Sequence, residues 1–384
     1  MTTCYTCRMQ RYDAIVLGIG GVGSAALLQF AKRGAHAIGI DQFSPPHDRG
    51  SSHGHTRVIR QAYFEHPDYV PLLKESYRLW RELESNTGQQ LLHQIGLIEI
   101  GPRNGVVVPG VLRAAAEHGL SVKSFAATEI ERRWPGLRVS DDLVGVFEPT
   151  AGYLHVEDCV QAQLDAARSA GTNIVTNTEV TDWSANDREV RVRWAGGEIA
   201  AERMVIAAGP WAGRLITEMN ARLNVRRKSL FWFASDTAEF DVTGGMPVFL
   251  FELPRGVFYG FPKLDERGVK FAEHSGGRPV DDPLTVDRTI DLEERQRLVD
   301  VLSLHLPGVS SYVTDHTVCL YTMSPDEHFI VDRHPAHANV VFAAGLSGHG
   351  FKFAPVLGRA LADLALDGGT DLPIEFLSLS RFAQ

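Results

Sequence analysis

The sequence predicts an α/β fold, α+β overall, in which a parallel-sheet domain is interrupted by an inserted domain with a mostly antiparallel sheet. A glycine-rich turn follows an apolar run at residues 12–17, and the same strand-then-glycine pattern recurs at 204–209 and 339–350. Short strands rich in aromatic residues lie within residues 226–273, as is typical of antiparallel sheets. Because the glycine pattern occurs at both ends of the chain, we expect the first domain to be discontinuous.

The N-terminal elements form a β-α-β unit. The apolar run 12–17 is typical of a buried parallel strand. An Ala- and Leu-rich helix is expected over residues 22–33, and Gly34 follows it as a C-terminal glycine. A second strand is expected at residues 37–41, and this order predicts a nucleotide-binding half-sheet.

Further along the chain, periodicity predicts the remaining elements. An amphipathic helix is expected over residues 68–85, where apolar residues recur at steps of three and four. The other expected elements are a strand at 95–100, a helix at 157–170, strands near Ile174, Val190 and Met204, aromatic strands at 230–233, 248–251 and 257–261, and a helix at 292–304.

These elements predict two domains and a tail. The first domain comprises residues 12–90, 150–222 and 323–384, and the second comprises 91–149 and 223–322, with residues 1–11 as the tail. The tail contains Cys4 and Cys7 in a C-x-x-C pattern. No second cysteine pair completes a zinc site, so an ordinary tail is favoured over a metal or redox role.

Composition excludes several classes of protein. A net charge of −9 without a long basic run argues against nucleic acid as a partner. No apolar run approaches the length of a membrane span, and the first residues do not form a secretory signal, so a cytoplasmic location is expected. Four histidines of the first loop (His47, His53, His55, His66) fit no standard metal spacing, and no metal is expected.

A dinucleotide fingerprint lies between the first strand and the first helix. Gly18 permits a tight turn, Gly20 allows backbone to approach a pyrophosphate, and Gly23 allows the helix to pack closely on the sheet. Asp41 follows at the distance of a ribose-binding carboxylate. The motif alone does not separate NAD from FAD; the second glycine turn near the C-terminus favours the longer cofactor, FAD.

Several long motifs resemble the monomeric sarcosine oxidase and N-methyltryptophan oxidase family of flavoenzymes, over residues 12 to about 382. They are Gly50-Ser-Ser-His-Gly-His-Thr-Arg-Val-Ile-Arg60, Tyr69-Val-Pro, Arg133-Trp-Pro-Gly, Phe258-Tyr-Gly-Phe-Pro, Cys319-Leu-Tyr-Thr, Asp326-Glu-His-Phe-Ile and Gly345-Leu-Ser-Gly-His-Gly-Phe-Lys-Phe. The resemblance implies a Rossmann-like FAD-binding domain and FAD joined through its 8α-methyl carbon to the sulfur of Cys319. From the residues alone, a small buried apolar role is favoured for Cys319, because that is the commonest role of a free cysteine.

The resemblance also implies roles for the other matching residues. Arg57 lies near the flavin ring, Arg60 and Lys352 bind the substrate carboxylate, and Lys270 promotes the reaction with oxygen. Tyr259, His274 and Tyr321 line the substrate site. His53, Gly348, His349, Gly350 and Lys352 neighbour the flavin. Without the family, the arginines could form a solvated basic patch, Lys270 could be a surface lysine, and Tyr259 and His274 could be structural polar groups.

The function implied is that of an FAD-dependent oxidase of secondary, N-methylated amino acids, a monomer that reduces O2 to hydrogen peroxide. Sarcosine is the first substrate expected; N-methyl-L-tryptophan, pipecolate and other cyclic imino acids are alternatives. A flavin dehydrogenase that passes electrons to a protein acceptor is a hypothesis from another class, which Lys270 disfavours. A non-catalytic nucleotide-binding module is a third hypothesis. It would not explain why Arg60, Lys352 and Cys319 occur together in one chain.

Overall fold

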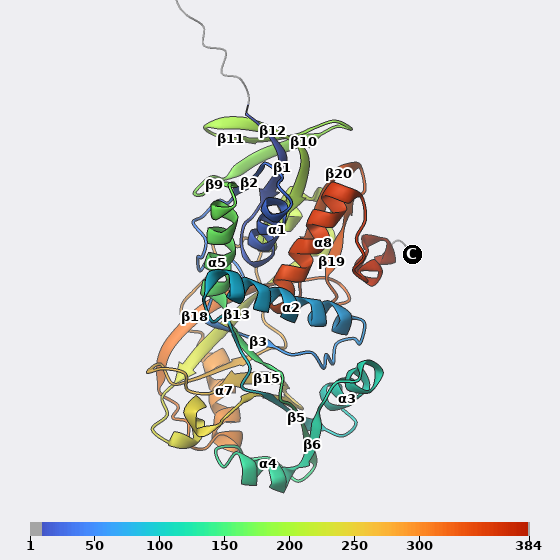
Figure 1. Cartoon of the computed structure of the whole chain (residues 1–384). Helices are drawn as coiled ribbons and strands as arrows, with labels where there is room; N and C mark the ends of the chain where they lie inside the picture. Colours follow the sequence, from blue (N-terminus) through green and yellow to red (C-terminus); the bar gives the residue numbers. More distant parts are fainter. Residues whose placement is uncertain (1–9, 383–384) are drawn as a thin grey trace, which may run out of the picture. The chain divides into compact units, whose positions relative to one another are not determined.

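The computed structural model describes residues 10–382, so Cys4 and Cys7 lie outside the described residues. The chain divides into two compact units (Figure 1). Within the described range, the first unit comprises residues 10–52, 157–224 and 322–382, and the second comprises 53–156 and 225–321. No helix in the described range is both long and apolar enough to cross a membrane.

The first unit contains a mixed sheet of eight strands among the described residues. Strands β1, β2, β9, β12 and β20 pair in parallel, whereas β10, β11 and β19 add antiparallel edges. The strands are β1 (Arg11–Leu17), β2 (Ala37–Ile40), β9 (Asn173–Val175), β10 (Val180–Ala185), β11 (Val190–Trp194), β12 (Gly197–Ile206), β19 (Ile330–His334) and β20 (His337–Ala344). The helices are α1 (Gly21–Lys32), α5 (Val156–Ser169), α6 (Ala212–Leu215) and α8 (Ala354–Asp367).

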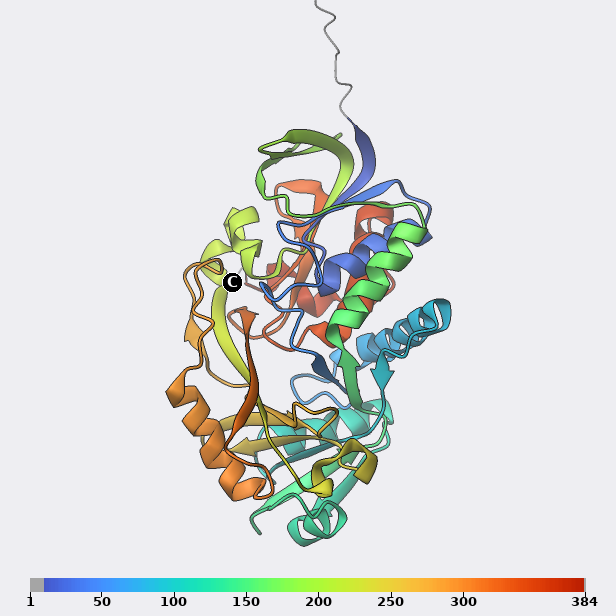
Figure 2. The ribbon, with the colours of Figure 1, turned by 90° about the vertical axis from the view of Figure 1, so that its left-hand side faces the viewer.

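Helices α1 and α8 lie side by side in this unit (Figures 1 and 2). A Cβ added at Gly358 of α8 would meet the backbone of Ala25 at 2.6 Å, so the two helices approach more closely there than a side chain would permit. Ser24 of α1 also donates a buried hydrogen bond to Gln163 of α5 (2.6 Å). Small residues on α1 therefore set the packing of the helix that begins at the glycine turn.

The second unit contains a large, mostly antiparallel sheet and a small three-stranded sheet. The large sheet is ordered β17, β13, β16, β15, β14, β5, β7, β6, and β18 also pairs with β13. Its strands are β5 (Leu97–Pro102), β6 (Lys123–Ala126), β7 (Leu143–Glu148), β13 (Asn224–Phe233), β14 (Val248–Leu253), β15 (Gly256–Phe261), β16 (Val269–Glu273), β17 (Arg278–Pro279) and β18 (Val313–Met323). The small sheet has β3 (Thr56–Ile59), β4 (Leu92–His93) and β8 (Gly152–His155), and the helices are α2 (Tyr69–Thr87), α3 (Val107–His118), α4 (Ala127–Arg133) and α7 (Leu292–His305).

Alternation along the strands of the large sheet separates two apolar clusters. Phe231 and Phe233 of β13 join one cluster with residues of α4 and α7. Leu230 and Trp232 of the same strand join the other, together with residues of α3 and with Cys319. Because successive side chains of a strand point to opposite faces, the face that carries Cys319 also carries the even-numbered residues of β13.

The fold class is confirmed, and the structure differs from expectation at several boundaries. Residues 53–90 and 150–156, expected in the first domain, belong to the second unit. The backbone N–H groups of Gln61 and Ala62 donate to the Glu148 carboxylate of β7 (2.9 Å each), and β8 pairs with both β3 and β4. Helices α3 and α4 were not expected, since each is short and follows a strand closely. The C-terminal helix begins at Ala354, after a 3₁₀ turn over Phe351–Phe353.

Candidate active site

The glycine turn after β1 is shaped by steric demands. Gly18 has a left-handed φ of 79°, which favours glycine. A Cβ at Gly23 would lie 1.8 Å from the carbonyl oxygen of Gly18, so this position excludes any side chain. At Gly20 the nearest side-chain atom would be 3.6 Å away, which leaves room beside the backbone. The turn therefore fits a pyrophosphate approaching the N-terminus of α1.

Asp41 follows β2 and is buried, with 8% of its surface exposed. Its two carboxylate oxygens accept the backbone N–H groups of Ile19 and Phe43, each at 2.9 Å. His47 Nε2 lies 3.5 Å from the same carboxylate. Asp41 thus ties the glycine turn to the loop after β2, and its role at the nucleotide ribose stays a prediction.

The second glycine turn leads from β20 into the C-terminal helix. Gly348 has a φ of 80° and the preceding Ser347 one of 46°, which makes a sharp reversal. His349 and Lys352 are both buried, and the Lys352 ammonium donates to the carbonyl of His349 (2.8 Å). The imidazole Nε2 of His349 lies 3.0 Å from the carbonyl oxygen of Glu327. Gly348, His349, Gly350 and Lys352 therefore form one compact turn, and their cofactor roles stay predictions.

In the second unit, Arg57 and Cys319 are in contact. The Arg57 Nη2 atom lies 3.0 Å from the Cys319 sulfur, and Nη1 donates to the carbonyl of Thr56 (2.9 Å). Cys319 is 1% exposed. The guanidinium therefore places a positive charge beside this buried sulfur.

Lys270 is a buried cation on β16. Its ammonium donates to the carbonyls of Gly54 (2.6 Å) and Thr56 (2.9 Å) and to the Thr56 hydroxyl (3.0 Å). Its Nζ also lies 4.9 Å from the ring centre of Phe261 and 5.2 Å from that of Trp232. These contacts hold the ammonium beside the segment from Gly54 to Thr56. Because Lys270 is buried, it is not a surface lysine.

Tyr259, Tyr321 and His274 form a connected polar group. The two phenols are hydrogen-bonded, and the Tyr321 hydroxyl lies 3.4 Å from His274 Nδ1. Burial raises the pKa of both tyrosines, so both are neutral phenols near pH 7. The nearby positive charge of Arg57 opposes this shift without reversing it.

Arg60 is buried among carboxylates. Its Nη2 donates to both oxygens of Glu65 (2.8 and 2.9 Å), and its Nε lies 3.5 Å from Glu99. Burial lowers the pKa of Arg60, but these carboxylates outweigh it and keep the pKa above its ordinary value. Within residues 10–382, the buried Nη1 atom has no hydrogen-bond partner. The predicted substrate anchor is thus a fixed cation with one nitrogen still able to donate.

Sequence reasoning missed Lys228 of β13. It is 4% exposed, and its Nζ lies 5.4 Å from the ring centre of Tyr321. Strand alternation was the available signal, because Lys228 shares its strand face with Leu230 and Trp232. A lysine in an alternating strand ordinarily faces solvent, so the sequence alone does not mark Lys228 as buried.

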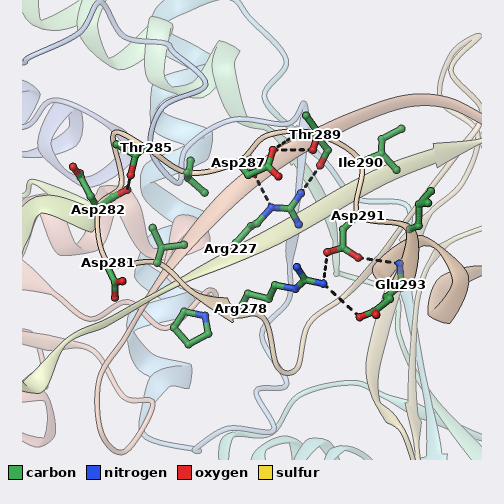
Figure 3. Close-up of a pocket in the computed structure, with 14 residues that line it drawn as sticks. Arg227, Arg278, Asp281, Asp282, Thr285, Asp287, Thr289, Ile290, Asp291 and Glu293 are labelled. Carbon is green, nitrogen blue, oxygen red and sulfur yellow. Dashed lines mark hydrogen bonds and ion pairs between the residues drawn. The ribbon is translucent and has the colours of Figure 1, made fainter.

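A cavity of about 510 Å³ opens elsewhere in the second unit, beside the loop between β17 and α7 (Figure 3). It shares no residue with the predicted site. Arg227 donates to the carbonyls of Asp287 (2.8 Å) and Thr289 (2.6 Å), as Figure 3 shows. Arg227 therefore holds this loop in place through two hydrogen bonds. Among the described residues, no cluster of His, Cys, Asp or Glu is arranged to hold a metal.

Comparison with known proteins gives consistent matches along the chain. A family model described as FAD dependent oxidoreductase matches residues 13–364. The monomeric sarcosine oxidase of Bacillus sp. (strain B-0618) is 37% identical over 375 residues, 96% of each chain. The N-methyl-L-tryptophan oxidase of Salmonella dublin is 35% identical over 385 residues, 97% of this chain and all of that one. The solved structure of NikD in its open form, an amino acid oxidase essential for nikkomycin biosynthesis, matches with a TM-score of 0.84 at 26% identity, covering 96% of this chain and 97% of that one.

Proposed function

Because the chain belongs to the FAD dependent oxidoreductase family, in its branch of sarcosine and N-methyltryptophan oxidases, we propose that it oxidises N-methylated amino acids. Sarcosine is the first candidate substrate. In the net reaction, sarcosine, O2 and water give glycine, formaldehyde and hydrogen peroxide. FAD, when bound, would accept the two electrons and the hydrogen that leave the methyl carbon and nitrogen as the C–N bond becomes an imine, which water then hydrolyses. The observation that carries this proposal is one sheet face with Cys319, Lys270, Tyr259 and Tyr321.

The glycine turn and Asp41 would hold the nucleotide part of FAD, and Cys319 would attach the flavin covalently. The 3.0 Å contact between Arg57 and the sulfur supports this, because it holds a positive charge beside the sulfur that would be attached. Acid precipitation tests the link: the yellow colour should stay with the protein pellet. Colour released into the supernatant would refute covalent attachment.

Arg60 would bind the substrate carboxylate through Nη1, while Glu65 keeps the guanidinium in place. A charge-assisted hydrogen bond from a fixed guanidinium is strong and directional. Lys352 would add a second positive charge, and Tyr259, Tyr321 and His274 would line the site. The neutral phenols can donate hydrogen bonds without adding negative charge beside the carboxylate.

Lys270 would promote the reaction with oxygen, because a fixed positive charge stabilises the negative charge that develops on O2 as it is reduced. Its three hydrogen bonds hold that charge in one place. In Lys270→Met, flavin reoxidation by O2 should slow by about a hundredfold or more. An unchanged reoxidation rate would remove this role.

A peroxide-release screen of purified protein tests the whole proposal. The panel contains sarcosine, N-methyl-L-tryptophan, pipecolate and proline, with glycine as the unmethylated control. Release with sarcosine above all others is expected, whereas a preference for N-methyl-L-tryptophan or pipecolate would reassign the substrate. Reduction of the flavin by an amine without peroxide release would instead support a dehydrogenase that uses a protein acceptor.

A further inference from the structure

Lys228 joins two of the proposed substrate-site residues. Its ammonium donates to the carbonyl of Ser275 (2.6 Å), the residue directly after His274. The same ammonium lies 5.4 Å from the ring centre of Tyr321, and the Tyr321 hydroxyl lies 3.4 Å from His274. In the part of the chain that the structure describes, the Ser275 carbonyl is the one hydrogen-bond acceptor of Lys228.

The two buried lysines of this sheet face therefore differ in their surroundings. The Lys270 ammonium donates to three oxygens and lies near two rings, whereas the Lys228 ammonium donates to one carbonyl and lies near one ring, that of Tyr321. A desolvated cation over an aromatic ring is attracted to it and restricts its orientation. Lys228 is thus placed to hold a side chain, Tyr321, and a backbone turn at the same time.

We propose that Lys228 is a positioning residue for substrate binding, whose charge fixes the Tyr321 ring and the turn after His274 in one arrangement. This inference rests on the proposed function, because it concerns the site in which Tyr321 and His274 would contact the amino acid. It adds a residue whose own contacts are with the protein and whose effect on substrate passes through Tyr321 and His274.

The charge of Lys228 is expected to depend on pH. Burial lowers the pKa of Lys228 to about 8; Glu273 and Glu294 oppose this shift, and Arg297 and Arg226 add to it. The Tyr321 ring also faces Lys228, with His274 beyond it beside the Tyr321 hydroxyl, and burial keeps the Tyr321 phenol neutral. The ammonium is charged below pH 8 and loses its proton above it, so the hold on Tyr321 weakens as the pH rises.

Kinetics of three purified holoprotein variants test the proposal. In Lys228→Met, KM for the amino acid should rise about tenfold, the loss of one charge-assisted contact, while flavin reoxidation by O2 keeps its rate. Lys228→Arg should restore KM to within about threefold of wild type, because arginine supplies the same charge. Lys123→Met, an exposed lysine of β6, is the matched control.

The pH profile separates positioning by charge from mere packing. The wild-type kcat/KM should fall as the pH rises through about 8, and this fall should disappear in Lys228→Arg, which stays protonated. A Lys228→Met variant as active as the control, or an unchanged profile in Lys228→Arg, would overturn the inference. If Lys228→Met does not fold, the Lys228→Arg profile decides alone.

A measurement without turnover keeps this test apart from that of the proposed function. The near-ultraviolet circular dichroism of tyrosine should change between pH 7 and 9 in the wild type and not in Lys228→Arg or Tyr321→Phe. If no amine on the panel is oxidised, the proposed function fails, and this spectrum still tests the contact between Lys228 and Tyr321. A spectral change retained in both variants would refute the contact.

Discussion

Arg57 and Arg60 stand three residues apart, and their surroundings give them different chemistry. Arg57 contacts a sulfur and a backbone carbonyl. Arg60 contacts Glu65 and Glu99 and is stacked over the rings of Tyr63 and Phe64, with its guanidinium carbon 4.2 and 4.3 Å from the ring centres. Arg57 therefore lies beside the sulfur of Cys319, the atom proposed to bind the flavin. Arg60 is a rigid cation whose orientation is fixed before any ligand binds.

Replacing Arg60 by lysine tests the role of the guanidinium geometry. Lysine keeps the charge beside Glu65 and Glu99, so the protein should fold. A single ammonium, however, cannot hold Glu65 through two bonds and also present a second donor nitrogen. KM for the amino acid substrate should therefore rise by about tenfold or more, measured by peroxide release.

The control for this prediction is Arg78→Lys, since Arg78 is an exposed arginine that also pairs with two carboxylates, Glu75 and Glu82. Its kinetic constants should stay at the wild-type values. An Arg60→Lys variant with the KM of the control would show that Arg60 only balances the buried carboxylates.

Among the elements, the turn from β1 into α1 tolerates little change. The Gly23 position admits no Cβ, because the Gly18 carbonyl oxygen occupies that space. The start of α1 and the end of β1 are therefore held at backbone contact, which brings the N–H groups of the helix end to the nucleotide side of the turn.

Gly23→Ala should lower the free energy of unfolding by about 3 kcal/mol or more and reduce the flavin content, because the added methyl group must push α1 from β1. Urea unfolding and the ratio of absorbance at about 450 and 280 nm measure the two effects. Gly369→Ala is the control, since a Cβ there meets no atom within 4 Å and its φ is not left-handed. Equal flavin content in both variants would contradict the close-contact argument.

At the scale of the whole molecule, a covalent cofactor would change how stability depends on solution conditions. A ligand that dissociates stabilises the folded state according to its free concentration, whereas a tethered one does so regardless of it. The proposed bond between Cys319 and FAD therefore predicts a difference that unfolding can measure.

In Cys319→Ser, the unfolding free energy should rise by about 1.4 kcal/mol for each tenfold increase in free FAD above its dissociation constant, whereas the wild type should not respond. Thermal or urea unfolding at a series of FAD concentrations measures this. Cys159→Ser is the control, because Cys159 is the other buried cysteine of the described chain and lies on α5. If the unfolding free energy of the wild type also rose with free FAD, the cofactor would be dissociating from it, and the proposed covalent link would be refuted.

Sequence patterns were enough to predict the fold class, the β-α-β unit with its glycine turn, and the family, all of which are confirmed. These features depend on local patterns, such as strand and helix periodicity and glycines whose steric roles act over a few residues. Whole motifs, including the segments around Arg57 and Cys319, then carried the resemblance, because they are long and unusual in composition.

The tertiary structure alone decided which partners the site residues meet. The contacts of Cys319 with Arg57, of Lys270 with Gly54 and Thr56, and of Lys228 with Tyr321 join residues that are between about 90 and 260 positions apart. Tertiary structure also assigned residues 53–90 and 150–156 to the second unit, through the contacts of Gln61 and Ala62 with Glu148 and the pairing of β8 with β3 and β4. Strand register sets such contacts, and register depends on pairing between distant segments, which no local pattern specifies.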